Sequence, residues 1–122
     1  MNQEVFEKIY ELLKELNVKV VWYYPETFKN LPIISYYIAN DADQSFTTGS
    51  NLVLTEQACI IDVWARTPEE TISLASQTDS KLKQIGLKKV FANSLDPLGD
   101  AKRISMRYEW VFNIQTKQIT RQ

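Results

Sequence analysis

The sequence predicts an α+β fold: a single domain in which a mostly antiparallel sheet has two helices packed on one face. Segments 3–17 and 68–85 place apolar residues at helical spacing along one side. The other segments are rich in β-branched and aromatic residues, and the last one alternates between apolar and polar side chains. The order helix, strand, strand, long loop, strand, helix, strand, strand favours antiparallel pairing with both helices on the same face.

Length and composition indicate one domain, 1–122, that folds around its own core. The chain has 122 residues, of which 44% are apolar and 24% are charged. A domain of this size buries about two-thirds of its unfolded surface. We therefore expect it to fold without metal or disulfide bonds.

The N-terminal third predicts one helix and two strands. Helix 3–17 ends near Asn17, and strand 18–24 ends at Pro25. A second strand follows over 31–40. The helix residues that we expect to pack against the sheet are Phe6, Ile9 and Leu13, with Leu16 continuing the same stripe.

The middle of the chain predicts a loop, a strand and a capped helix. Residues 40–50 are polar and small, which favours a long loop or an extended hairpin tip, and strand 51–66 follows. In the sequence Thr-Pro-Glu-Glu over 67–70, the threonine is expected to cap helix 68–85. Gly86 follows the helix as its C′ residue. The expected buried residues of this helix are Ile72, Ala75 and Leu82.

The C-terminal third predicts two strands and a polar tail. A short strand over 87–92 precedes a turn over 93–100, and residues 115–122 are polar. In the final strand one face consists of Ile104, Met106, Tyr108, Trp110, Phe112 and Ile114.

Composition removes several classes of active site. The chain has no histidine and one cysteine, Cys59, so Ser-His-Asp triads and Cys-His pairs are excluded, together with paired-cysteine zinc sites. Its three glycines stand too far apart for a phosphate-binding loop. Asp41-Ala-Asp43 resembles the start of a calcium loop but lacks its glycine, and Leu52 stands where its glutamate should be. We expect no metal and no cofactor.

The remaining carboxylates are interpreted structurally. Glu69 and Glu70 fall in the first turn of a predicted helix, where negative charge stabilises the exposed N–H groups. Asp62 interrupts an apolar strand. It either points outward on a solvated face or pairs with a basic neighbour, and no catalytic partner for it is visible in the sequence.

Nucleic acid and membranes are not expected partners. Aromatic residues gather at 22–24 and 36–37, but only Lys19 and Lys29 lie near them, so packing is favoured over base stacking. No apolar run reaches the roughly 20 residues that span a bilayer. The N-terminus lacks the pattern of a signal peptide, and the single cysteine favours an intracellular location.

The charges are distributed unevenly along the chain. Residues 1–80 hold 5 basic and 12 acidic side chains, and residues 81–122 hold 9 basic and 3 acidic ones. Folding either mixes these halves or produces an acidic face and a basic face suited to head-to-tail association. The second alternative makes Glu7 and Glu11 candidate contacts for Arg103 and Arg107 of a neighbouring copy.

Three segments together resemble a known family. They are 31–40 (LPIISYYIAN), 60–65 (IIDVWA) and 67–70 (TPEE). This combination resembles the small tail-completion proteins of long-tailed bacteriophages and prophages, which are tail terminators or tail-to-head joining proteins. The resemblance covers roughly the whole chain, and its motifs are structural rather than catalytic.

The resemblance implies a non-enzymatic virion protein. It would form a hexameric ring of identical copies at the end of the tail tube, contacting the tail-tube protein and head-connector proteins. Before assembly it would lie in the cytoplasm of the host bacterium. The family has a long loop after its second strand, which makes the matching residues here candidate contacts: Asp41, Asp43, Phe46, Thr47 and Thr48.

Two other classes of function stay open on the sequence alone. One is a small intracellular enzyme or ligand-binding domain that uses carboxylates, since some hydrolases need only two of them. The other is a regulatory interaction domain.

Overall fold

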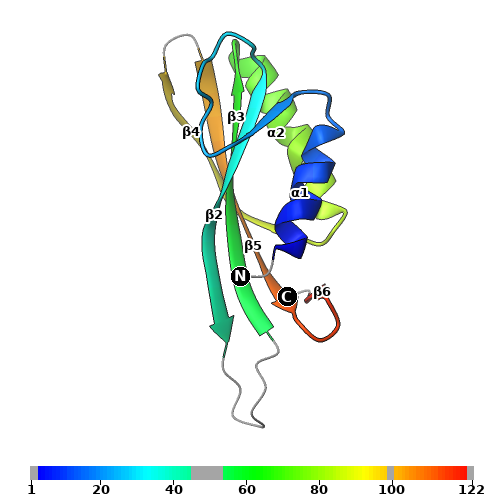
Figure 1. Ribbon diagram of the computed structural model, residues 1–122. Coiled ribbons are helices and arrows are strands. Elements are labelled where there is room, and N and C mark those ends of the chain that lie inside the picture. Colours follow the sequence, from blue (N-terminus) through cyan, green and yellow to red (C-terminus); the bar gives the residue numbers. More distant parts are fainter. Residues whose placement is uncertain (1–2, 45–53, 99–100, 121–122) are drawn as a thin grey trace.

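The computed structural model describes residues 3–44, 54–98 and 101–120. Its elements are α1 (Glu4–Lys14), β1 (Lys19–Trp22), β2 (Ile33–Gln44), β3 (Leu54–Ala65), α2 (Pro68–Lys83), β4 (Lys88–Leu98), β5 (Ala101–Asn113) and β6 (Gln118–Thr120). Within the described residues the strand order is β1-β2-β3-β5-β4, with β6 paired to the end of β5. Both helices lie on the same side of the sheet (Figure 1), so the predicted α+β class is confirmed.

The main core fills the space between the helices and the sheet. Phe6, Ile9 and Leu13 of α1 are buried there, as predicted. The β5 residues predicted to share a face enter the same core, including Tyr108 and Trp110, but Ile114 lies beyond the end of β5 and is 36% exposed. The rings of Phe6 and Trp110 meet edge to face, with centroids 5.3 Å apart. This geometry is favoured between aromatic rings, so it fixes α1 on the sheet.

Helix α2 begins as predicted but presents a different face to the core. The Thr67 hydroxyl accepts a hydrogen bond from the Glu70 backbone N–H at 3.1 Å, which is the predicted cap. The prediction for Ile72 was wrong, because its side chain is 62% exposed. The helix buries Thr71 and Thr78 instead, alongside Leu74 and Leu82, and Ala75 packs against the same core.

Hydrogen bonding explains how a threonine takes the place expected for Ile72. The Thr71 hydroxyl donates to the Thr67 carbonyl at 2.7 Å, so its polar atom is satisfied within the helix. The small Thr71 side chain therefore packs against the sheet without leaving a buried donor unpaired. The larger Ile72 is left on the outer side of α2.

Three segments predicted to be irregular belong to the sheet. Strand β2 continues to Gln44, so residues 40–44 are paired with β3, which agrees with the extended hairpin and not with the long loop among the two expectations. Strand β4 continues through the predicted turn to Leu98. The predicted polar tail contains β6, whose residues Gln118–Thr120 pair with the end of β5. Polar composition misled the prediction here, because backbone pairing needs no apolar side chains.

Strand β1 is the exception to antiparallel pairing. It runs parallel to the first part of β2, with Lys19 opposite Ile33 and Trp22 opposite Tyr36. Tyr23 has a positive φ of 67° and ends the strand. The connection over 23–32 then crosses to the other side of the sheet, where Phe28 packs on the ring of Trp64. That connection covers one end of the face away from the helices.

This second face, which we call the helix-free face, has an ordered arrangement of side chains. Strand register places a polar row across its middle, consisting of Ser35, Asp62, Ser105 and Asn93. The row on one side consists of Ile33, Trp64, Arg103 and Leu95. The row on the other side consists of Tyr37, Ile60, Arg107 and Phe91.

Candidate assembly surfaces

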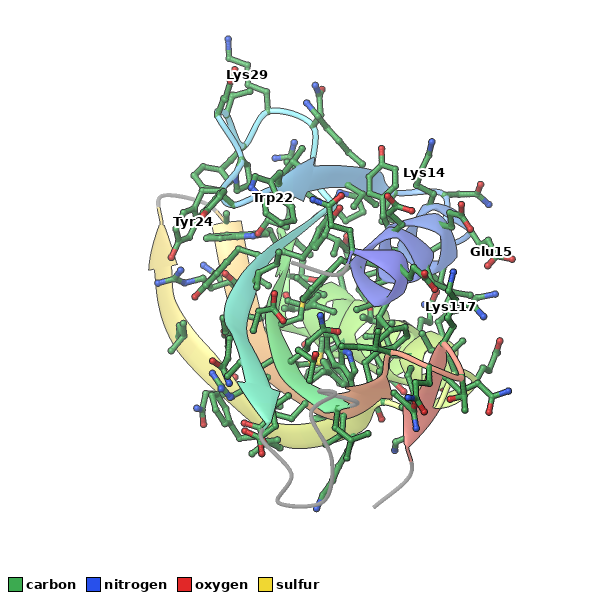
Figure 2. The ribbon with its side chains drawn as sticks, turned by 60° about the horizontal axis from the view of Figure 1, so that its bottom comes forward. Lys14, Glu15, Trp22, Tyr24, Lys29 and Lys117 are labelled. Atoms are coloured by element: carbon green, nitrogen blue, oxygen red, sulfur yellow. The ribbon has the colours of Figure 1, made fainter. Side chains whose placement is uncertain are left out.

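An open groove runs between α1 and the β1–β2 edge of the sheet. Its volume is about 750 Å³. Trp22 of β1 lies at this edge, and Figure 2 shows it with Tyr24 near the end of the strand. The apolar and aromatic residues that line the groove are Phe6, Tyr10, Trp22, Tyr23, Tyr36 and Ile38.

Aromatic contacts hold the groove in shape. The ring of Trp22 stands perpendicular to that of Tyr36, with centroids 4.9 Å apart, and also contacts Tyr23. Tyr10 of α1 lies 6.1 Å from Tyr36 on the opposite wall. Burial raises the pKa of Tyr36 to about 12, with Cys59 and Tyr10 adding to the effect, so this phenol stays neutral at physiological pH. The groove is thus a preformed aromatic surface.

The charged residues that line the groove are both acidic. They are Glu7 and Glu11, exposed on successive turns of α1. Farther along β2, Asp41 accepts a hydrogen bond from the Gln57 amide at 3.2 Å. Lys14 lies over the ring of Tyr10, with its nitrogen 5.2 Å from the ring centroid. We call the groove with Glu7 and Glu11, together with Asp41 of β2, the acidic edge.

The opposite edge of the sheet is formed by β4 and is basic and apolar. Every residue over 88–95 is exposed, including Phe91 and Leu95, at 41% and 39%. Lys88 begins the strand. Register places Arg107 beside Phe91, and Arg103 beside Leu95. We call β4, together with Arg103 and Arg107 of β5, the basic edge.

The two arginines of the basic edge are held differently. The guanidinium of Arg107 donates to the Glu109 carboxylate at 2.8 Å, which is an ion pair within β5. Arg103 lies over the ring of Trp64, 5.0 Å from its centroid, and its buried Nε has no hydrogen-bond partner among the described residues. Arg103 is therefore also part of the packing of the helix-free face.

The Asp62 carboxyl lies in the centre of the helix-free face, only 2% exposed. Asp62 lies on the face away from the helices, but that face is not solvated around it, contrary to the first sequence expectation. For the second expectation, Arg103 is a nearby positive charge that acts on the carboxyl, without a salt bridge between them among the described residues. The Oδ1 of Asp62 has no hydrogen-bond partner among the described residues. Burial raises the pKa of this carboxyl, although Ser105 and Arg103 oppose the shift. Burial and the nearby Asp62 also raise the pKa of Tyr37.

Neighbouring side chains shield this polar row from water. The indole N–H of Trp64 donates to the Ser35 hydroxyl at 2.9 Å, and Trp64 is fully buried. Tyr24 and Phe28 from the 23–32 connection contact the same indole ring. Ser35, Asp62 and Ser105 are thus buried by the chain itself, whereas Asn93 at the end of the row is exposed.

Several lysines near the end of α2 are engaged within the chain. Lys83 and Lys89 both face Asp79, at 2.8 and 3.6 Å, and the Tyr108 hydroxyl donates to the same carboxylate at 2.8 Å. Burial alone would raise the pKa of Asp79, but the hydrogen bonds from Lys83 and Tyr108 hold it below its usual value. This network stabilises the packing of α2 on the sheet.

Folding mixes the acidic and basic halves of the chain in two places. Lys117 lies 3.7 Å from Glu4 of α1, on the side shown in Figure 2, and Lys81 lies 3.8 Å from Glu15. Glu7 and Glu11 are not part of these pairs. The charge asymmetry of the sequence therefore persists in part, as the acidic edge and the basic edge.

Of the predicted contact residues in the segment 41–50, two lie among the residues that the structure describes. Asp41 and Asp43 lie in β2, paired opposite Gln57 and Thr55 of β3. Phe46, Thr47 and Thr48 lie outside the described residues. The sequence pattern did not identify the groove, although the aromatic residues at 22–24 and 36–37 were its signal.

The described residues give little material for metal chemistry. Among residues 3–44, 54–98 and 101–120, no group of three or more Cys, Asp and Glu side chains could hold a metal ion. Glu69 and Glu70 occupy the first turn of α2, as expected for residues that stabilise a helix N-terminus. No helix in this part of the chain is long and apolar enough to cross a membrane.

No family model matches the chain, and a search of the curated proteins finds no match either.

Proposed function

We propose that this chain is a non-enzymatic structural protein that associates head to tail into a ring of identical copies. The observation that carries the proposal is the separation of charge between opposite edges of one sheet. The acidic edge presents Glu7 and Glu11 beside an aromatic groove. The basic edge presents Lys88 and Arg107 beside exposed Phe91.

Such surfaces favour a heterologous contact over a two-fold one. Like charges would face each other if either edge met its own copy, whereas acidic against basic is attractive. A contact between two different patches, repeated by a rotation that divides a full turn, closes into a ring, whereas any other repeat gives an open filament. Exposed charges of this kind set the encounter rate and orientation, while the aromatic and aliphatic side chains supply most of the affinity.

The place of this ring is proposed from the resemblance to phage tail-completion proteins. In that role the ring would be a hexamer at the end of a tail tube, where it would stop tube growth or join the tube to head-connector proteins. The chain would then lie in the bacterial cytoplasm before assembly and in the virion after assembly. Adding it to tube subunits from the same genome, as they polymerise, should yield shorter tubes with extra density at one end.

Sedimentation velocity across salt concentrations tests the self-association. Replacing Glu7 and Glu11 by glutamine should weaken association, and added salt should weaken it for the unchanged chain, because exposed charges are screened within about 10 Å at 0.1 M salt. The matched control is Ser76→Lys with Ser80→Lys, which gives the same change in net charge on exposed positions of α2. Association that responds equally to both variants, or to neither, would contradict the proposal.

A charge exchange gives the sharper test. The variant Glu7→Lys with Glu11→Lys should not associate with itself, and neither should Lys88→Glu with Arg107→Glu. A chain carrying all four changes should regain association, because each edge then meets the opposite charge again. Circular dichroism of each variant checks that it is folded.

A ligand-binding domain is the second candidate, and the groove is the observation that favours it. An aromatic groove with two carboxylates at its rim suits an apolar ligand with a cationic group. Trp22 lines the groove and is 46% exposed, so its fluorescence would report on such binding. Saturable quenching by an alkylammonium ligand, lost in Trp22→Leu, would support this candidate.

A further inference from the structure

The sheet has two edges where the backbone lacks a strand neighbour on one side. Within residues 3–44, 54–98 and 101–120, strand β1 pairs with residues 33–36 of β2 and with no other strand. In the same ranges, the remaining part of β2 over 37–44 is paired with β3 alone. At the other edge, β4 is paired with β5 alone among the described residues. Unpaired N–H and C=O groups at a sheet edge are a template for pairing with another chain.

We propose that β4 of one copy pairs antiparallel with the 37–44 part of β2 in a second copy, so that one sheet continues across the contact. This inference rests on the self-association proposed above and specifies how two copies contact each other. The acidic edge of one copy is then occupied by the basic edge of a second copy, whose β4 adds to the sheet as a further strand.

The direction of pairing follows from the topology. Strands β2 and β3, β3 and β5, and β5 and β4 are all antiparallel, so β4 runs opposite to β2 within one copy. If neighbouring copies are related by rotation about an axis along the strands, every strand keeps its direction. The β4 strand of one copy then meets the β2 strand of the next in antiparallel orientation.

Two features limit how far the strands can pair. Residues 88–95 of β4 are exposed, and among the described residues the part of β2 beyond β1 is 37–44. Pro97 of β4 has no N–H to donate, so it limits pairing beyond the exposed part. Strand β1 limits pairing at the other end, because it already occupies the edge of β2 up to Tyr36.

The side chains complement each other in this orientation. Antiparallel pairing brings the start of β4 to the end of β2, where register places Lys89 and Asp41 on the same side of the sheet, the side that the helices cover. It also brings Leu95 toward Tyr37, and both of these residues belong to the helix-free face. Charge thus meets opposite charge at one end, and apolar side chains meet at the other.

Cross-linking between two batches of the protein, each with a cysteine introduced at a different position, tests this pairing. One batch carries Asn93→Cys in β4, and the other carries Ala42→Cys or Asn40→Cys in β2. All three positions are exposed and share the helix-free side of the sheet by register. The native Cys59 is fully buried and should stay unreactive.

Oxidation of the mixture should give a dimer in which a disulfide joins β4 of one copy to β2 of another. Neither batch alone should form this dimer. The matched control pairs Ala42→Cys with Ile72→Cys, which is exposed on α2. We expect several-fold more dimer from the β4 and β2 pair than from this control. Equal yields, with association still seen by sedimentation, would overturn the strand pairing but leave the proposed ring intact. Absence of association in sedimentation would overturn both.

Charge-altered variants give a second readout that does not depend on a disulfide. Exchanging Lys89 for glutamate should weaken association, and Asp41→Lys in the partner batch should restore it. Because Lys89 also faces Asp79, circular dichroism of the variant checks that it is folded. A deficit that Asp41→Lys fails to reverse would count against this strand pairing.

Discussion

The two faces of the sheet bury their side chains by different means. The face under the helices is filled by aliphatic and aromatic groups from α1 and α2. The helix-free face has no helix above it, yet Ser35 and Asp62 are as deeply buried as the main core. Its cover comes from the 23–32 connection and from neighbouring side chains, above all Trp64. Low exposure therefore does not indicate an apolar environment in this molecule.

Neighbouring isoleucines of β3 provide the largest test of this difference. Ile61 faces the helices and is fully buried, whereas Ile60 faces away and is 8% exposed. Ile61→Ala should lower the free energy of unfolding by about 3–5 kcal/mol, because the helices above it cannot close the cavity, and Ile60→Ala by about 2 kcal/mol. Urea unfolding of both variants measures the contrast. Equal losses would mean that the two faces are packed alike.

Asp79 tests the charged network on the covered side. Its folded-state pKa lies below its usual value, so its stabilising effect is full above the unfolded pKa and is lost as the pH falls through the folded pKa. Asp79→Asn should lower the free energy of unfolding by about 1–2 kcal/mol at pH 7, since charge-assisted hydrogen bonds are lost. The loss should shrink in acid, as thermal unfolding between pH 2 and 7 would show.

Asp62 should behave in the opposite way. Burial raises its pKa in the folded state, so its ionised form opposes folding above the unfolded pKa, and its contribution becomes more favourable as the pH falls through the folded pKa. Asp62→Asn should raise the free energy of unfolding at pH 7 by about 1 kcal/mol, because a buried charge with an unpartnered oxygen is removed. Destabilisation at pH 7 with no change in pH dependence would show that the carboxylate is well paired.

Two buried threonines of α2 provide the smallest test. The Thr78 hydroxyl has no hydrogen-bond partner among the described residues, whereas that of Thr71 donates to Thr67. Thr78→Val should change stability by at most about 0.5 kcal/mol, in the favourable direction, and Thr71→Val should lower it by about 1 kcal/mol. Chemical unfolding of both variants under the same conditions provides the comparison.

The sequence predicted the parts of the fold that depend on strong local signals. The Thr67 cap and the alternation of β5 are examples, because each follows from a few neighbouring residues. The buried face of α2 was misassigned because apolar spacing favours Ile72, while packing selected Thr71 and Thr78. The parallel pairing of β1 with β2 was also missed, since no local pattern distinguishes it from an antiparallel neighbour.

The candidate site was harder to foresee. Glu7 and Glu11 were selected from charge alone, and only the fold places them beside Trp22 and Tyr36 in one groove. The basic edge depends on the length of β4, which Pro97 had suggested was a turn. Strand edges belong to the assembled sheet, so a single segment does not reveal which of its sides will be unpaired.

The central position of β3 and β5 has a consequence for the order of folding. These strands pair along their full lengths, from Leu54 opposite Asn113 to Ala65 opposite Lys102, although α2 and β4 separate them in the sequence. Pairing them closes a long loop, which is slow because chain entropy must be lost before the contacts form. The nearby pairs, β2 with β3 and β4 with β5, close shorter loops and should form first. Joining these two units through β3 and β5 would then complete the molecule, and the backbone amides at that junction should exchange with deuterium only on global unfolding.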